Sequence, residues 1–381
     1  MTRDFALILL AQLAFGFAFS SFFLLPKYVV TELSGSPRQV GYVGALAVMA
    51  SVLASPVAGK LLDRGGRRPL MFVGCTLSAL AALAFLEVTR IGAYLYAVRA
   101  AQGVAYTLYF VAAATLVADL APAARLSQAL GWFGCAGLLM NAVATLIAER
   151  IAENFGWPAV FICAAVSGSS GAGVALLLRE PPTRPQVTGV VAAPVSGAPG
   201  ARFAILWATV AGGAAFGVMF TFTPPLALSL GDSNISPLFA GYTAAALAVR
   251  LLFGNLADRV GRARVGGIAL ALYSAVVAST AGLGHGWLAA LGLGFGLAHG
   301  AFYPSLNALA LEGVSRERRG TVGAHFNAAF NGGVLIVTFC FGQIAQLYGY
   351  RVVFLVVACL SASGSFVLWS QARKSWLVRP S

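Results

Sequence analysis

The chain has 381 residues, of which 59% are hydrophobic and only 10% are charged. A soluble protein would carry about 25% charged residues, so this composition excludes a soluble globular chain. The formal net charge of +13 would suggest a nucleic-acid partner in a soluble protein. Here the basic residues lie in short segments between apolar runs, so we expect no nucleic-acid partner.

Twelve apolar runs follow one another along the chain, each long enough to cross the hydrocarbon core as a helix of roughly 20 residues. The sequence therefore predicts an all-α membrane protein with 12 transmembrane helices in two pseudo-symmetric six-helix bundles. The first six predicted spans cover residues 5–30, 39–61, 69–89, 91–118, 126–148 and 157–178. The second six cover residues 203–229, 236–256, 264–284, 287–311, 320–345 and 350–371.

A segment rich in Pro, Gly and small residues separates the two halves, which is typical of a flexible linker. The predicted parts are an N-terminal bundle over 1–178, a cytoplasmic linker over 179–202, a C-terminal bundle over 203–372 and a cytoplasmic tail over 373–381.

Lysine and arginine predict the orientation, because cytoplasmic segments carry an excess of both. Nineteen of the 25 lie on the side that holds the two termini. The other side holds five, namely Lys27, Arg38, Arg90, Arg150 and Arg351, and the remaining one, Arg99, lies inside a span. We therefore expect a multi-pass protein of the inner cell membrane with both termini in the cytoplasm.

The two halves repeat each other in direct order. The segment GKLLDRGGR, which begins at Gly59, recurs as GNLADRVGR, which begins at Gly254. Further along, Asp119 matches Glu312 and the sequence GWPAVF matches GYRVVF. Parallel repeats with a binding site between them near the middle of the membrane are an arrangement of transporters.

Each copy of this motif lies between the second and third span of its half, where we expect a gating role. Its glycines would end a helix and permit a tight turn with positive φ. Its arginines would anchor at the lipid headgroups, and its aspartate would cap the positive end of a neighbouring helix. The motif residues are Gly59, Asp63, Arg64, Gly66 and Arg67 in the first copy, and Gly254, Asp258, Arg259, Gly261 and Arg262 in the second.

The motif resembles the signature loop of the major facilitator superfamily, and the resemblance covers the whole chain. It implies that Asp63 meets the start of the eleventh span near Gly320, and that Arg67 reaches Asp119. The run from Arg99 to Gly103 resembles the second motif of the family, where an intramembrane arginine is tied to proton coupling.

The Gly-Pro motif of drug/proton antiporters is missing from the fifth span, where Asn141 lies near the expected proline. Two other stretches, which start at Tyr242 and Tyr303, resemble the bacterial exporters that include sugar-efflux permeases and opine-metallophore exporters.

Ionisable groups inside a span are costly and therefore mark candidate functional positions. The sequence places Arg99, His299 and His325 there and no Asp or Glu at mid-span. Because histidine exchanges a proton near neutral pH, His299 is the first candidate proton carrier and His325 the second. Polar residues at helical spacing would line a substrate cavity. These are Gln102, Tyr106, Tyr109, Tyr303, Asn307, Asn327 and Asn331. For each single asparagine, hydrogen bonding between helices is favoured over contact with the solute.

These patterns together predict a proton-coupled exporter of a small organic solute that works by alternating access. An uptake symporter or facilitator on the same fold stays open, and a sensor or enzyme is a remote alternative. We expect a monomer with no cofactor and no metal site, since the five cysteines are scattered and no phosphate-binding loop is present.

Overall fold

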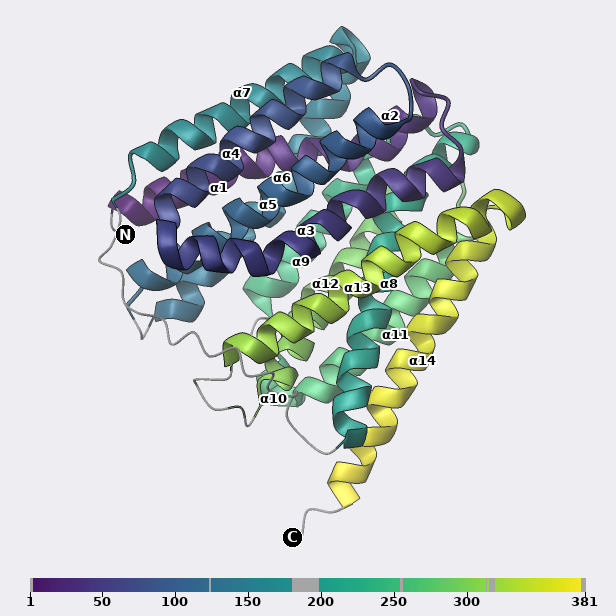
Figure 1. Ribbon diagram of the computed structural model, residues 1–381. Helices are drawn as coiled ribbons and strands as arrows, with labels where there is room; N and C mark the ends of the chain where they lie inside the picture. The colour runs from purple at the N-terminus through teal and green to yellow at the C-terminus, as the bar shows by residue number, and fades with distance from the viewer. Residues whose placement is uncertain are drawn as a thin grey trace. The chain divides into compact units, whose positions relative to one another are not determined.

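This computed structural model describes residues 3–122, 125–179, 199–253, 256–312, 314 and 319–377. Side chains are described for these residues except at positions 63, 127, 199, 319–321 and 371–377. Within the described ranges every regular element is a helix (Figure 1). By its internal contacts the chain divides into two compact units. The first comprises Met1–Val187 with Asn234–Ser236, and the second comprises Thr188–Ser233 with Pro237–Ser381.

The helices of the first unit follow the predicted spans closely. They are α1 (Arg3–Ser20), η1 (Ser21–Leu24), α2 (Leu25–Thr31), α3 (Pro37–Gly65), α4 (Arg67–Ala84), η2 (Phe85–Glu87), α5 (Ala93–Leu120), α6 (Leu126–Phe155) and α7 (Trp157–Leu176). The first span is interrupted, because η1 is a 3-10 helix between two α-helices. Pro26 has no N–H to donate to the fourth residue before it, and the Leu25 N–H bonds the nearer carbonyl of Phe22 instead.

The second unit contains the remaining helices. They are α8 (Pro199–Ser229), α9 (Ser236–Leu252), α10 (Leu256–Val260), α11 (Arg262–Thr280), α12 (Leu288–Ala310), α13 (Arg319–Tyr348) and α14 (Tyr350–Leu377). α8 begins four residues before the predicted span, and α14 continues as a helix into the predicted tail. Most of the predicted linker lies outside the described residues.

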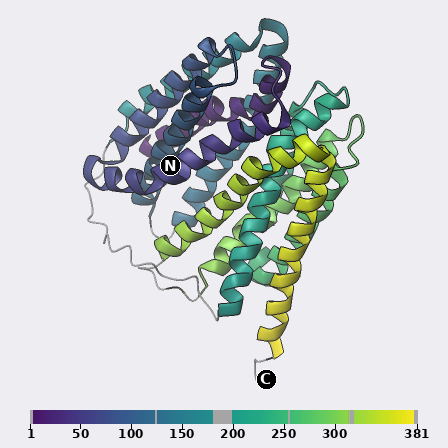
Figure 2. The ribbon, with the colours of Figure 1, turned by 45° about the vertical axis from the view of Figure 1, so that its right-hand side comes forward.

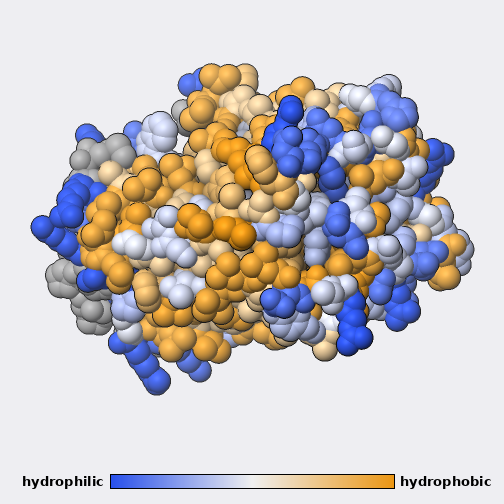
Figure 3. Space-filling model, turned by 90° about the horizontal axis from the view of Figure 1, so that it is seen from above, coloured by the Kyte–Doolittle hydropathy of each residue, from blue (hydrophilic) through white to orange (hydrophobic). Residues whose placement is uncertain are grey.

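All twelve predicted spans are helical, and ten helices within the described ranges are long and apolar enough to cross a membrane. The other two predicted spans correspond to α9, which has 17 residues, and α12, which has 23. Large apolar side chains such as Leu53, Val166 and Phe366 are 62–73% exposed. Figure 3 shows a face on which such apolar residues gather. This surface suits a lipid environment, and the chain is a multi-pass membrane protein.

The packing partners repeat between the units. In the first unit α1 contacts α6 and α7, and α4 contacts α5 and α7. In the second unit α8 contacts α13 and α14, and α11 contacts α12 and α14 (Figure 2). Four glycines with positive φ join consecutive helices at matching positions, namely Gly66 (84°), Gly156 (78°), Gly261 (107°) and Gly349 (83°). Each unit is therefore one copy of the same arrangement.

Candidate functional site

The first copy of the loop motif forms an ion pair within the first unit. α3 continues to Gly65, so the predicted loop is reduced to Gly66, whose positive φ turns the chain into α4. Arg67 is therefore the first residue of α4, and its Nε lies 2.9 Å from Oδ2 of Asp119 near the end of α5. The Arg67 side chain is 4% exposed and that of Asp119 is 26% exposed.

The second copy makes a looser version of the same contact. Gly261 forms the turn, and Arg262 begins α11. Its Nη2 lies 2.9 Å from Asp258, one helical turn earlier, and its Nη1 lies 4.0 Å from Glu312. All three side chains are at least 35% exposed. The pairing of Arg262 with Glu312 is the repeat equivalent of Arg67 with Asp119.

The other motif residues are placed less tightly. Gly59 was expected to end its helix, but it lies inside α3, and no described atom comes within 4 Å of the position that a side-chain methyl group would take there. This expectation was wrong because the helix continues past the apolar run into the polar residues. Arg64 and Arg259 are exposed. Gly254 and the side chain of Asp63 lie outside the described residues, so the predicted docking of Asp63 stays a prediction.

Arg99 is buried where α5 packs against α3. Its Nε donates to the carbonyl oxygen of Val43 at 3.1 Å, and its Nη1 donates to the side chain of Gln102. Arg99 is 9% exposed and Gln102 is 4% exposed. None of these contacts is a carboxylate. The positive charge therefore stays in the interior of the first unit, held by oxygen dipoles.

The tyrosines of α5 belong to an aromatic group with α1. Tyr109 is fully buried in the core, with its ring 3.9 Å from that of Phe15. Its hydroxyl has no hydrogen-bond partner among the described residues. Tyr106 is half-buried, and its ring lies 4.7 Å from Phe19 and 5.4 Å from Phe110. Of the two, Tyr106 has the more accessible ring.

His299 lies within a group of aromatic rings in the second unit. Its Nδ1 is 2.5 Å from the hydroxyl of Tyr273, and the residue is 6% exposed. The rings of Phe216 and Tyr242 lie 5.2 and 5.7 Å from the imidazole. Tyr273 was not predicted as a partner, because α11 carries no repeated polar spacing that would indicate it.

A second polar group combines Tyr303, one turn after His299 on α12, with two asparagines on α13. The hydroxyl of Tyr303 is 3.5 Å from Oδ1 of Asn327, which also accepts from Nδ2 of Asn331 at 3.4 Å. The structure thus brings together three of the predicted polar residues. Asn307 has a buried Oδ1 without a partner among the described residues. His325 is exposed on α13 and is not part of this group.

One ion pair of the first unit was not predicted from the sequence. Lys27 on α2 lies 2.5 Å from Glu149 on α6, and their side chains are 11% and 2% exposed. The predicted end of the fifth span at residue 148 was too early, because α6 continues as a helix to Phe155 and the side chain of Glu149 is buried. The sequence indicated this ion pair only by placing a lysine near the end of the first predicted span and a glutamate at the end of the fifth.

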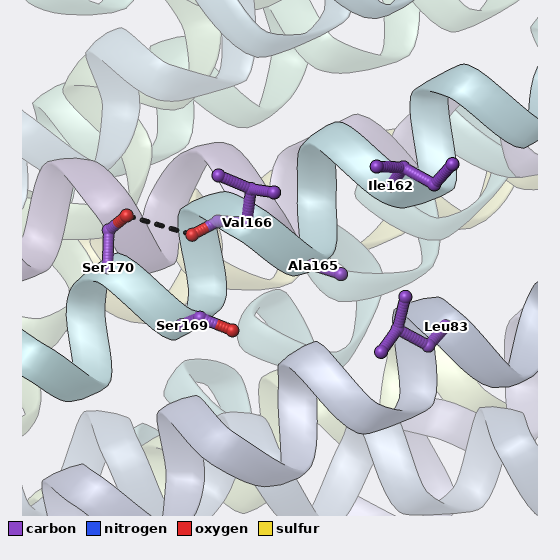
Figure 4. A pocket seen from close by; sticks show the side chains of 6 residues that line it. All are labelled: Leu83, Ile162, Ala165, Val166, Ser169 and Ser170. Carbon is purple, nitrogen blue, oxygen red and sulfur yellow. Dashed lines mark hydrogen bonds between the residues drawn. The ribbon is translucent and has the colours of Figure 1, made fainter.

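An open groove of about 450 Å³ lies on the outer face of α4 and α7 (Figure 4). Leu83, Ile162 and Val166 in its lining are exposed, and Ser170 donates to the carbonyl of Val166 at 2.8 Å. The groove contains none of the charged groups described above. It matches an apolar surface that faces lipid rather than a polar binding site.

The sequence matches the family described as Major Facilitator Superfamily over residues 7–237 and 205–381. Similar curated proteins include the multidrug resistance protein MdtL of Escherichia coli, 26% identical over 162 residues that cover 42% of this chain and 40% of MdtL. The bicyclomycin resistance protein homolog of Haemophilus influenzae is 26% identical over 156 residues, 40% of this chain and 39% of that protein. The chain thus matches about two fifths of the length of these relatives.

A solved structure of a POT family transporter in complex with a thioalcohol conjugated peptide has the same fold. It superposes with a TM-score of 0.82 at 12% identity, and the match covers 98% of this chain and 96% of that one. The predicted all-α fold is thereby confirmed, and ten of its helices within the described ranges are long and apolar enough to cross a membrane. Since the family match extends from residue 7 to the end of the chain, the protein belongs to the Major Facilitator Superfamily.

Proposed function

We propose that the protein is a secondary active transporter that exports a small organic solute. The main support is its membership of the Major Facilitator Superfamily together with its similarity to proteins named for multidrug and bicyclomycin resistance. Resistance is a consequence expected of export. The buried side chains of Arg99 and His299 support transport further, since ionisable groups inside spans mark solute or ion pathways.

In this proposal the protein is a monomer of the inner cell membrane with both termini in the cytoplasm. The distribution of lysine and arginine supports this orientation. The coupling ion is the proton, and one charge that moves down 100 mV releases about 2.3 kcal/mol. His299 and Arg99 are the proposed residues for proton coupling, with His325 as a further candidate.

The motif residues of the two loops serve as the gate. The ion pair of Arg67 with Asp119 supports this role, because it joins the start of α4 to the end of α5. A contact of this kind can hold one conformation and release it when a partner is displaced. Tyr303, Asn307, Asn327 and Asn331 are the proposed solute contacts of the second unit. Gln102, Tyr106 and Tyr109 are the proposed solute contacts of the first unit.

Metabolite profiling of cells that lack the protein tests the direction of transport. Export predicts that at least one small solute is retained inside the deletion cells and leaves again when the wild-type chain is restored. Uptake predicts the opposite sign, with that solute depleted inside. Unchanged levels of every solute, inside and outside, would contradict transport itself.

Inside-out vesicles with an imposed pH gradient test proton coupling, with the solute identified above as the probe. His299→Gln is expected to abolish gradient-driven accumulation of the solute while exchange across the membrane continues. His285→Gln is the matched control, because His285 is 72% exposed and pairs with Asp232 at 2.9 Å. Full gradient-driven transport by the His299 variant would exclude this role for the residue.

A further inference from the structure

Glu149 is a buried carboxylate that is surrounded by hydrogen-bond donors. Its Oε1 accepts from Nζ of Lys27 at 2.5 Å and from the backbone N–H of Ile235 at 2.8 Å. Its Oε2 accepts from the N–H of Ile235 at 3.0 Å and from the N–H of Ser236 at 2.6 Å. The side chain is only 2% exposed. Both oxygens are therefore engaged as acceptors, and neither faces another acceptor among the described contacts.

The charged surroundings of Glu149 are simple. α6 packs against α1, η1, α5 and α7, and Lys27 follows η1 on α2. Lys27 is the one ionic side chain within ion-pair distance of Glu149 in the part of the chain that the structure describes. The other titratable side chains on these elements and in the adjoining segments are Arg3, Asp4, Tyr28, Glu32, Tyr94, Tyr96, Arg99, Tyr106, Tyr109, Asp119, Arg125, Cys135, Arg150, Glu153, Cys163 and Asp232.

The arrangement is compatible only with the ionised carboxylate. A neutral carboxyl group carries an O–H donor on one of its two oxygens. On Oε1 that hydrogen would face the ammonium of Lys27 and the N–H of Ile235, and on Oε2 it would face two backbone N–H groups. Proton binding and this set of contacts therefore exclude each other. Conversely, a buried carboxylate that loses its donors is unstable as an anion and takes up a proton.

We propose that Glu149 is a proton-binding site, and that its protonation releases the backbone of Ile235 and Ser236. This inference rests on the proposed function, since it gives the coupling proton a further position on the chain besides His299, Arg99 and His325. The released segment, Asn234–Ser236, belongs to the first unit and leads directly into α9. Because linkage is reciprocal, any conformation in which this segment has left Glu149 favours the protonated form.

Infrared difference spectroscopy on the full-length protein in lipid nanodiscs tests proton binding directly. Between neutral and acidic pH, the wild type is expected to gain the C=O stretching band of a protonated carboxyl group, and Glu149→Gln to lack that contribution. Glu153→Gln is the matched control, because Glu153 lies one turn further along α6 and is exposed. An identical band in wild type and Glu149→Gln would overturn the proposal.

Hydrogen–deuterium exchange tests the release of the segment. In the peptide that contains Ile235 and Ser236, Glu149→Gln is expected to speed amide exchange about 10–100-fold relative to wild type, because each N–H loses a charged acceptor. Glu149→Asp keeps the charge and is expected to change exchange less. If Glu149→Gln does not fold, the wild type is compared at neutral and acidic pH after correction for intrinsic exchange rates. Exchange that does not respond to the variant or to pH would also overturn the proposal.

Neither readout uses a solute. A protein that exports nothing would still show the carboxyl band and the change in amide exchange. If the protein exports a solute but shows neither of these signals, only the proposed role of Glu149 is refuted. Failure of this inference is therefore distinct from failure of the proposed function.

Discussion

Arg67 and Arg262 occupy equivalent residues of the two loop motifs, yet their surroundings differ. Arg67 is almost completely buried and bonds directly to Asp119, whereas Arg262 is half-buried and stays 4.0 Å from the exposed Glu312. Water screens an exposed pair and leaves it a contribution of about 0–1 kcal/mol. A buried charge depends on its partner much more strongly. The same sequence motif therefore makes a strong contact in one unit and a weak one in the other.

We predict that Asp119→Ala lowers the free energy of unfolding by about 3 kcal/mol, because it removes the carboxylate from a buried guanidinium. The matched variant Glu312→Ala is expected to lower it by less than about 1 kcal/mol. Chemical denaturation of both variants in mixed micelles measures the difference. Equal losses in the two variants would show that burial does not decide the strength of these pairs.

At the scale of single residues, the sequence predicted the contact that the family resemblance implies better than contacts that no motif indicates. The pairing of Arg67 with Asp119 followed from the resemblance to a family. The partners of His299 and Lys27 did not follow from the sequence. Tyr273 and Glu149 lie on other helices, and which sides of two helices face each other depends on how the helices pack. The predicted end of the fifth span at 148 also left Glu149 outside by one residue.

Helix contacts in this protein depend on a few glycines at close crossings. A methyl group on Gly103 of α5 would overlap the carbonyl oxygen of Ala47 on α3. The equivalent Gly296 of α12 is just as close to the carbonyl oxygen of Tyr242 on α9. The backbones therefore touch at the same place in both units. Small residues at such crossings replace the hydrophobic driving force that lipid does not supply.

Gly103→Ala is expected to destabilise the protein by about 1–3 kcal/mol, because α3 and α5 must separate to admit the methyl group. Gly131→Ala provides the control, since no described atom lies within 4 Å of the added carbon on α6. That control is expected to be neutral or to stabilise the helix by up to about 1 kcal/mol. Thermal unfolding of the purified variants measures both. A loss for Gly131→Ala as large as that for Gly103→Ala would contradict the steric explanation.

The sequence contains 44 glycines, but it does not show which of them form the crossings. Helix ends were also less predictable than helix cores. α3 continues beyond its apolar run to Gly65, because Asp63 and Arg64 are compatible with a helix even though they are not apolar. Hydropathy detects the membrane-embedded part of a helix and does not detect where its backbone hydrogen bonds end.

For the whole molecule, the fold was the most predictable property. Runs of about 20 apolar residues leave little choice except membrane helices, since backbone groups in lipid must be satisfied internally. The repeat then indicated two similar halves. The polar groups inside each unit were less predictable, because their partners come from helices that are distant in the sequence.

We predict that both termini and both loop motifs lie on the cytoplasmic face. A fluorescent protein fused to the C-terminus should therefore lie in the cytoplasm and fluoresce there. Cysteines placed at Arg64 and Arg259 should be labelled by a thiol reagent from the cytoplasmic side. Cysteines at Gly35 and Gly286 should be labelled from the opposite side. Labelling of the two motif positions from different faces would disprove the direct repeat.

The short 3-10 helix η1 has a consequence for the direction of Lys27. A 3-10 helix has 3.0 residues per turn against 3.6 in an α-helix, so each of its residues advances about 20° further around the axis. Over the four residues of η1 this adds about 80°. In an uninterrupted α-helix, the side chain of Lys27 would be rotated by that angle about the helix axis. The break before Pro26 therefore aims the ammonium group at the carboxylate of Glu149.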